Sequence, residues 1–190
     1  MIPEGLGRLQ PLLLASRSPQ RRAILTMLGV DFEVVEPADD EPPLAGEPGG
    51  IAVTHARAKA ASVEGRCVLG VDTLVAAEGR ALGEPAGEEQ AREYLALLSG
   101  RTHTVHSGLC LRLDGIEHVR HAATDVTFAT LEPSDLDWYI ATGEWRDRAG
   151  GYAVQGRGAA LVRSIAGDYQ NVVGLPVAAL IDVMAVAAVR

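Results

Sequence analysis

The pattern of apolar and polar residues predicts a chain in which strands and helices are mixed. Short apolar runs at 12–15, 32–35 and 66–71 predict buried strands, the last of them ending at Asp72. Apolar residues recur with helical spacing over 19–28, 51–63, 87–98, 133–142 and 176–189. Two further strands are expected at 152–155 and 159–165.

Turn residues join some of these segments into hairpins. Asp114-Gly115 separates the alternating runs 102–113 and 116–128, which is the strongest hairpin signal in the chain. Glu78-Gly79 separates a shorter pair of strands. Antiparallel hairpins beside strand–helix units predict an α/β fold with a mixed sheet.

Cap residues mark the ends of two helices. Ser18 is the expected N-cap of the helix at 19–28, Pro19 its first residue, and Gly29 follows its end. The helix at 133–142 is expected to be capped near Ser134.

Length and composition favour a single folded domain over residues 1–190, or two closely joined lobes. Of its residues 47% are hydrophobic and 22% charged, which is too apolar for a disordered chain. The net charge of −8 argues against a nucleic-acid polymer or an anionic membrane as partner.

Cys67 and Cys110 lie in apolar runs and are interpreted as buried reduced thiols. Without a signal peptide or membrane span in the sequence, we expect a cytoplasmic protein.

Two segments depart locally from that average charge. Residues 16–22 carry Arg17, Arg21 and Arg22 where a strand passes into a helix N-terminus, which suits a bound phosphate. The alternative is an ordinary capped helix with solvated arginines. Residues 36–48 carry five acids and no base. They predict an irregular loop, either merely solvated or supplying a carboxylate to a metal.

Asp72 and the glycines at 147–158 are the other candidates for chemistry. A carboxylate at the end of a buried strand can hold a divalent cation or activate water, or it can simply cap the turn. Clustered glycines permit close approach to a ligand, but equally permit tight turns. The histidine pairs 103/106 and 118/121 lie three apart on expected strands, so their members face opposite ways and are not interpreted as metal ligands.

Taken together, these segments resemble the Maf family of nucleoside-triphosphate pyrophosphatases. The resemblance runs from about Leu12 to the last helix and rests on several ordered motifs. These are Leu14-Ala15-Ser16-Arg17-Ser18-Pro19 with Arg21-Arg22, Gly70-Val71-Asp72-Thr73, Leu82-Gly83-Glu84-Pro85, Leu98-Ser99-Gly100-Arg101-Thr102-His103, Asp147-Arg148-Ala149-Gly150-Gly151-Tyr152, Val154-Gln155-Gly156 and Gly167-Asp168-Tyr169-Gln170-Asn171-Val172-Val173-Gly174-Leu175-Pro176.

The resemblance implies a fold, a reaction and a set of site residues. The fold would be a mixed, twisted sheet with flanking helices and two lobes around a cleft, similar to inosine-triphosphate pyrophosphatases. The reaction would be hydrolysis of dTTP or UTP, and of modified pyrimidine triphosphates, to the monophosphate and pyrophosphate with Mg²⁺ or Mn²⁺. The residues that match family positions are Ser16, Arg21 and Lys59 for the triphosphate, Asp72 for the catalytic base, Glu41 and Asp72 for the metal, and Thr73 and Gln155 for the dTTP/UTP branch. A homodimer is also implied.

The chain departs from the family pattern at three positions. Glu84 stands where relatives usually have lysine, Gln20 where the dTTP/UTP branch commonly has arginine, and Gln170 where tyrosine is common. Arg80, Arg146 or Arg148 could supply the charge missing at 84. Two alternative functions follow: a nucleotide-binding regulator of cell division with little turnover, and a 7-methyl-GTP pyrophosphatase, which Thr73 and Gln155 disfavour.

Overall fold

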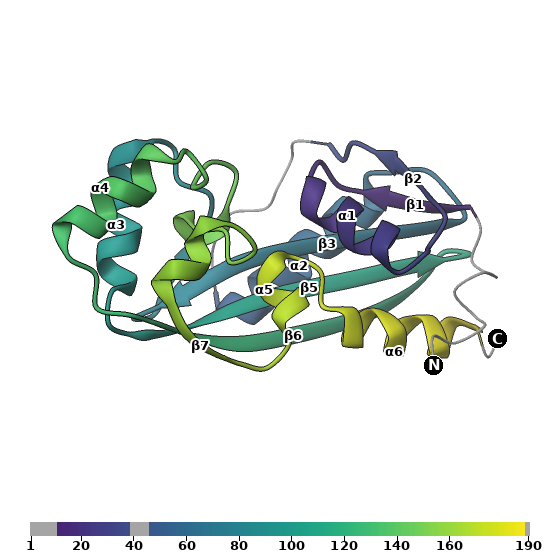
Figure 1. Ribbon diagram of the computed structural model, residues 1–190. Coiled ribbons are helices and arrows are strands. Elements are labelled where there is room, and N and C mark those ends of the chain that lie inside the picture. The colour runs from purple at the N-terminus through teal and green to yellow at the C-terminus, as the bar shows by residue number, and fades with distance from the viewer. Residues whose placement is uncertain (1–10, 39–45, 189–190) are drawn as a thin grey trace.

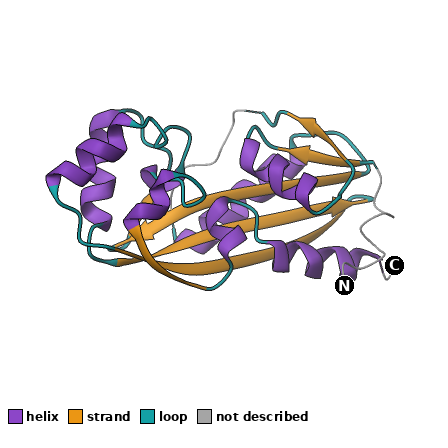
Figure 2. Cartoon of the chain, viewed as in Figure 1, coloured by secondary structure: helices purple, strands orange, loops and turns teal. Residues whose placement is uncertain are grey.

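The chain folds around one mixed β-sheet flanked by helices, as the sequence predicts. The computed structural model describes residues 11–38 and 46–188 (Figure 1). Long strands run through the sheet, and helices lie on both of its faces (Figure 2). The seven strands, in sheet order, are β2 (Phe32–Val35), β1 (Leu12–Ala15), β3 (Cys67–Ala77), β5 (Thr102–Leu113), β6 (Ile116–Phe128) and β7 (Val162–Ala166), with β4 (Arg80–Leu82) paired to β3.

Strand β3 is where the parallel and antiparallel parts of the sheet meet. β1 runs parallel to both β2 and β3, and its last residue, Ala15, pairs with Gly70. β5 pairs with β3 antiparallel over a longer stretch, from Cys67 to Ala76. The segment after β1 therefore leaves the sheet beside the middle of β3.

The prediction that the strand ends at Asp72 is wrong. β3 continues to Ala77, and Asp72 lies in its middle, opposite Gly108 of β5. The strand can continue because β5 supplies hydrogen-bonding partners along one edge after β1 has ended on the other. Asp72 therefore lies just beyond the point where the neighbouring strand β1 ends, and not at the end of its own strand.

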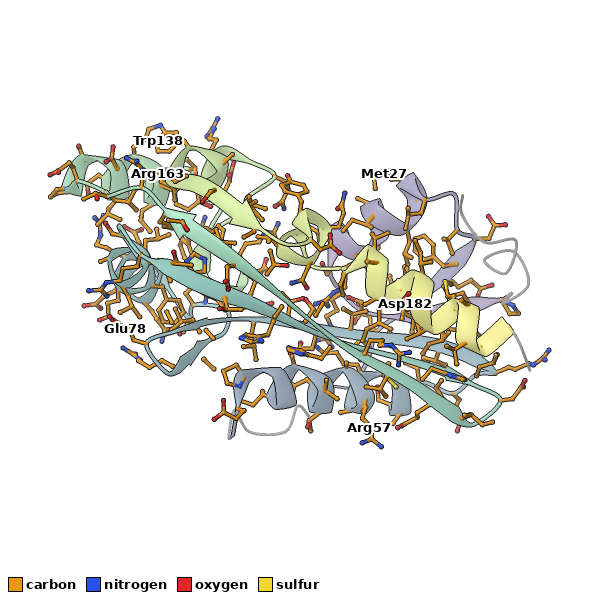
Figure 3. The ribbon with its side chains drawn as sticks, turned by 90° about the horizontal axis from the view of Figure 1, so that it is seen from below. Met27, Arg57, Glu78, Trp138, Arg163 and Asp182 are labelled. Atoms are coloured by element: carbon orange, nitrogen blue, oxygen red, sulfur yellow. The ribbon has the colours of Figure 1, made fainter. Side chains whose placement is uncertain are left out.

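The helices cover the two faces of the sheet. Their bounds are α1 (Pro19–Met27), α2 (Pro48–Ala61), α3 (Glu88–Leu98), α4 (Pro133–Ala141), α5 (Tyr169–Val173) and α6 (Val177–Ala188). Figure 3 shows α2, marked by Arg57, on one side of the sheet, with Met27 of α1 and Asp182 of α6 on the other.

Helix α2 packs directly against the backbone of the sheet. A Cβ atom at Gly70 of β3 would lie 2.2 Å from the Ala56 carbonyl oxygen, and one at Gly108 of β5 would lie 2.2 Å from that of Ala52. Only glycine allows such an approach. These two glycines set the height of α2 above the strand that carries Asp72.

The apolar core lies in two main clusters at opposite ends of the long strands. One joins β1, α1 and α6 through Leu14, Leu25 and Leu180, and the other joins α3 and α4 through Leu95 and Tyr139. Cys67 and Cys110 are buried free thiols, as predicted. Within the described ranges, no helix is both long and apolar enough to cross a membrane.

Several local predictions are confirmed and others are wrong. The hairpin at Asp114-Gly115 and the Ser18 cap are as predicted. Helix α4 is capped by Glu132 rather than Ser134, because Glu132 and Asp135 form a reciprocal capping box.

The glycine-rich segment contains no strand at 152–155. It forms the 3₁₀ helices η2 (Ala149–Gly151) and η3 (Arg157–Leu161) on either side of a turn, and β7 begins only at Val162. Gly150 and Gly151 have positive φ angles of 70° and 73°, which turn the chain just before the expected strand. The short helix α5 was not predicted from the sequence.

Candidate active site

A cavity of about 860 Å³ brings together the segments that the sequence analysis singled out. It is bordered by the loop after β1, the start of α1, the middle of β3, one side of α2 and the glycine-rich segment. The predicted site residues Ser16, Arg21, Lys59, Asp72, Thr73 and Gln155 all line it. Glu41, the other predicted metal ligand, lies outside the described residues.

Asp72 is the most buried carboxylate of this cavity, at 8% exposure, and two side chains of α2 hold it. Lys59 donates from Nζ to Oδ1 at 2.5 Å, and His55 Nδ1 lies 3.2 Å from Oδ2. Burial favours the neutral acid, but the hydrogen bond from His55 and the charges of Lys59 and Arg21 outweigh it and lower the pKa of Asp72 to about 2. The carboxylate is therefore ionised at neutral pH.

The helical repeat explains why His55 and Lys59 reach the same residue. They lie four positions apart, so both project from one side of α2. Asp72 shares its face of β3 with Gly70, the glycine against which α2 packs. The close contact between helix and sheet thus brings both side chains to the carboxylate.

Arg21 forms a second charged centre on the opposite face of β3. It is only 9% exposed. Its guanidinium donates from Nε to the Gly174 carbonyl at 2.9 Å, from Nη1 to Ser16 Oγ at 3.2 Å, and from Nη2 to Thr73 Oγ1 at 3.2 Å. Thr73 follows Asp72 in the strand and so points to the other face. Asp72 therefore presents its carboxylate on one face of β3, and the adjacent Thr73 contacts Arg21 on the other. Both charged groups line the same cavity.

The three arginines at the start of α1 do not act as one cluster. Arg21 and Arg17 line the cavity, whereas Arg22 turns back and donates to the Arg17 carbonyl. Arg17 also pairs with Glu36 at 3.3 Å, with both side chains more than half exposed. Ser18 caps the helix by accepting from the Arg21 backbone at 3.4 Å. Arg21 is therefore the buried cation of this segment.

The far side of the cavity carries groups of both charges. Gln155, Tyr152, Glu84 and Arg148 line it together. Of the arginines predicted as replacements for a lysine at 84, Arg148 lines the same cavity as Glu84, while Arg146 stacks on the Trp145 ring at 4.5 Å. Arg80 and Arg146 are absent from the described lining.

Two groups that complete these centres, His55 and Gly174, were not predicted from the sequence. No role was predicted for His55, although its four-residue spacing to Lys59 places both side chains on one side of a helix. Gly174, which lies between α5 and α6, contributes a carbonyl, and the motif that contains it does not mark that role.

The described residues fit a divalent cation that is shared with a substrate. Within the described ranges, no group of three or more His, Cys, Asp or Glu could hold a metal by itself. Mg²⁺ is usually bound by one or two carboxylates together with substrate phosphates and water. Asp72 supplies such an ionised oxygen donor inside the cavity.

Comparison with known proteins identifies the family. The sequence matches the family described as Maf-like protein over residues 11–187. A protein of Moorella thermoacetica named dTTP/UTP pyrophosphatase is 47% identical, over 92% of this chain and 94% of its own length. Proteins of the same name from Nitratidesulfovibrio vulgaris (90% of this chain, 84% of the relative) and Thermus thermophilus (91% and 92%) are 47% and 42% identical. This confirms the resemblance seen in the sequence: the chain belongs to the Maf family.

Proposed function

We propose that this chain hydrolyses dTTP and UTP to the nucleoside monophosphate and pyrophosphate. The proposal is based on three charged side chains that line one cavity. Asp72 pairs with Lys59, and the buried Arg21 lines the same cavity. An ionised carboxylate beside two cations suits a reaction that needs both a proton acceptor and a site for polyphosphate. The names of the relatives support the choice of nucleotide.

Arg21, Lys59 and Ser16 would bind the triphosphate. Arg21 reaches the cavity as a planar fork whose orientation is fixed by three hydrogen bonds within the protein. Lys59 is a flexible cation that could leave Asp72 Oδ1 for a phosphate oxygen. The start of α1 adds backbone N–H groups at the same end of the cavity.

Asp72 would then act on water. Once Lys59 contacts phosphate, Oδ1 is available to accept a hydrogen bond from a water molecule. The water oxygen forms a bond to the α-phosphorus, the bond from that phosphorus to the bridging oxygen breaks, and the proton passes to Asp72. Pyrophosphate leaves with the bridging oxygen, and Asp72 returns the proton to solvent.

A divalent cation, Mg²⁺ or Mn²⁺, would be held by Glu41 of the acidic segment 36–48 and by Asp72, whose Oδ1 has a second lone pair besides the one offered to water. When bound, it would offset the negative charge of the phosphate oxygens.

Gln155 is the candidate for contact with the pyrimidine. It lies in the glycine-rich segment that forms the far side of the cavity, and its amide can both donate and accept hydrogen bonds. Thr73 has a different role in this proposal, because its hydroxyl accepts from Arg21 and lies 2.9 Å from Ser107 Oγ. It would act on the substrate through Arg21.

The cellular setting follows from the substrate. Nucleoside triphosphates are consumed in the cytoplasm, so removal of excess or aberrant pyrimidine nucleotides would take place there. The homodimer implied by the family stays a prediction.

Pyrophosphate release from a panel of triphosphates, with Mg²⁺ and with Mn²⁺, tests the proposal. We expect release from dTTP and UTP, near-complete loss in Asp72→Asn, and parent activity in the control Asp182→Asn on the outer surface of α6. Binding of dTTP without release would favour the regulator, and release from 7-methyl-GTP alone would favour the other branch. Parent activity in Asp72→Asn would refute the assigned base.

A further inference from the structure

The two oxygens of Asp72 have different partners, a lysine and a histidine. Lys59 binds Oδ1 through a long, flexible chain, while the His55 ring lies against Oδ2. His55 is 3% exposed and projects from the side of α2 that faces the sheet. The proposed function also requires Lys59 to contact phosphate, so during the reaction His55 would be the partner that stays.

The chemistry of the pair fixes which atom donates. An ionised carboxylate can only accept hydrogen bonds, so His55 Nδ1 must carry the proton in the contact with Oδ2. A ring held between helix and sheet has few orientations, and its N–H therefore fixes both the position and the plane of the carboxylate. Oδ1 is then the oxygen that faces Lys59.

We propose that His55 is a positioning residue for the hydrolysis: its Nδ1–H anchors Oδ2 of Asp72, so that Oδ1 keeps its aim when Lys59 moves to the triphosphate. This inference rests on the proposed function, because it concerns the reaction in which Asp72 receives the proton. Displacement of a reacting group by about 1 Å can cost on the order of a hundredfold in rate. Loss of the anchor should therefore reduce kcat and leave substrate binding largely intact.

Two substitutions separate the hydrogen bond from the packing. In His55→Asn, the amide Nδ2 stands the same number of bonds from the backbone as Nδ1 and can still donate. His55→Leu fills the space without a donor. Thr54→Asn is a matched control, because Thr54 is the exposed neighbour on the same helix.

Steady-state kinetics with dTTP give the first readout. We expect His55→Leu to lower kcat by about 10–100-fold with KM changed by less than about threefold. His55→Asn should recover most of that loss, and Thr54→Asn should match the parent. Parent kcat in His55→Leu overturns the inference, as does an equal loss in both His55 variants when their thermal unfolding matches the parent.

The kinetics also distinguish failure of the role of His55 from failure of the proposed function. An active parent, an inactive Asp72→Asn and an unaffected His55→Leu would leave the function standing and remove the role of His55. A parent that releases no pyrophosphate would refute the proposed function and this inference with it.

Nitrogen NMR of the histidine rings gives a readout that does not depend on turnover. The His55 signals are identified by their absence in His55→Asn. We expect Nδ1 to be protonated at neutral pH in the parent, with a signal that shifts in Asp72→Asn. A bare Nδ1 with the proton on Nε2 alone would overturn the anchor.

Discussion

Arg21 donates from Nε to the carbonyl oxygen of Gly174 at 2.9 Å, although 153 positions separate them in the sequence. Gly174 lies between α5 and α6, so this bond fastens the first helix of the chain to its C-terminal helices. The same guanidinium contacts Ser16 and Thr73. The orientation of the buried cation in the cavity therefore depends on the loop just before α1 and on two segments that are distant in the sequence.

Arg21→Lys should impair activity even though the charge is kept. A single ammonium group cannot reproduce the planar fork that reaches three acceptors. With hydrogen bonds to charged groups worth roughly 1.5–3 kcal/mol, we expect kcat/KM for dTTP to fall by about 100-fold. Arg22→Lys is the control, because the Arg22 side chain donates to the exposed carbonyl of Arg17 and does not line the cavity. Equal activity of the two variants would contradict the role assigned to Arg21.

Thr73→Val should show that the hydroxyl acts through Arg21. Valine keeps the shape but leaves Arg21 Nη2 and Ser107 Oγ without this partner. We expect the free energy of unfolding to fall by about 1–3 kcal/mol, together with a higher KM for dTTP. Thr73→Ser keeps the hydroxyl and should stay close to the parent in both measurements. A change of nucleotide preference without loss of stability would instead place Thr73 in contact with the base.

Much of this architecture could be predicted, because its signals are local. Asp114-Gly115 requires positive φ at both positions, and the structure has 50° and 81° there. Ser18, Pro19 and Gly29 mark the ends of α1 for equally local reasons. Of the site residues that line the cavity, Ser16, Arg21, Asp72, Thr73 and Gln155 belong to ordered motifs, whereas Lys59 was predicted only as a matching family position.

The errors arose where the neighbours of a segment decide its structure. The length of β3 depends on its pairing with β5, and no residue near Asp72 in the sequence indicates that pairing. The segment at 152–155 has apolar residues suited to a strand, but a Cβ at Gly158 would lie 2.5 Å from the Ala153 carbonyl, so the chain folds back on itself instead. The contact of His55 with Asp72 needs the packing of α2 on Gly70 and Gly108, which only the assembled fold provides.

Gly70→Ala should damage both stability and activity. The new methyl group would lie 2.2 Å from the Ala56 carbonyl and push α2 away from β3. Overpacking of this kind costs about 1–3 kcal/mol, and the shift would separate Lys59 and His55 from Asp72. Gly50→Ala is the control on the same helix, because a Cβ there meets nothing within 4 Å. We expect Gly50→Ala to raise the free energy of unfolding by about 0.5–1 kcal/mol. Chemical denaturation and kcat are measured for both variants, and equal effects of Gly70→Ala and Gly50→Ala would contradict the packing role of Gly70.

His103 should make stability fall as the medium becomes acidic. Its ring is 2% exposed, packed edge-on against Phe128 and Tyr152. Burial lowers its pKa from 6.5 to about 4, against the opposing charge of Asp125. Between these values the unfolded chain binds a proton that the folded chain does not, so the free energy of unfolding decreases as pH falls from 6.5 to 4. At roughly 1.4 kcal/mol per pH unit, the loss from this residue reaches about 3 kcal/mol, and none arises above pH 6.5.

Chemical denaturation between pH 4.5 and 7.5 measures this contribution. His103→Gln keeps a polar partner for the Tyr152 hydroxyl, which lies 2.8 Å from His103 Nε2, but does not titrate. It should therefore lose less stability on acidification than the parent. Parallel profiles for the parent and His103→Gln would show that His103 is not held neutral, since the acid sensitivity would then come from other groups.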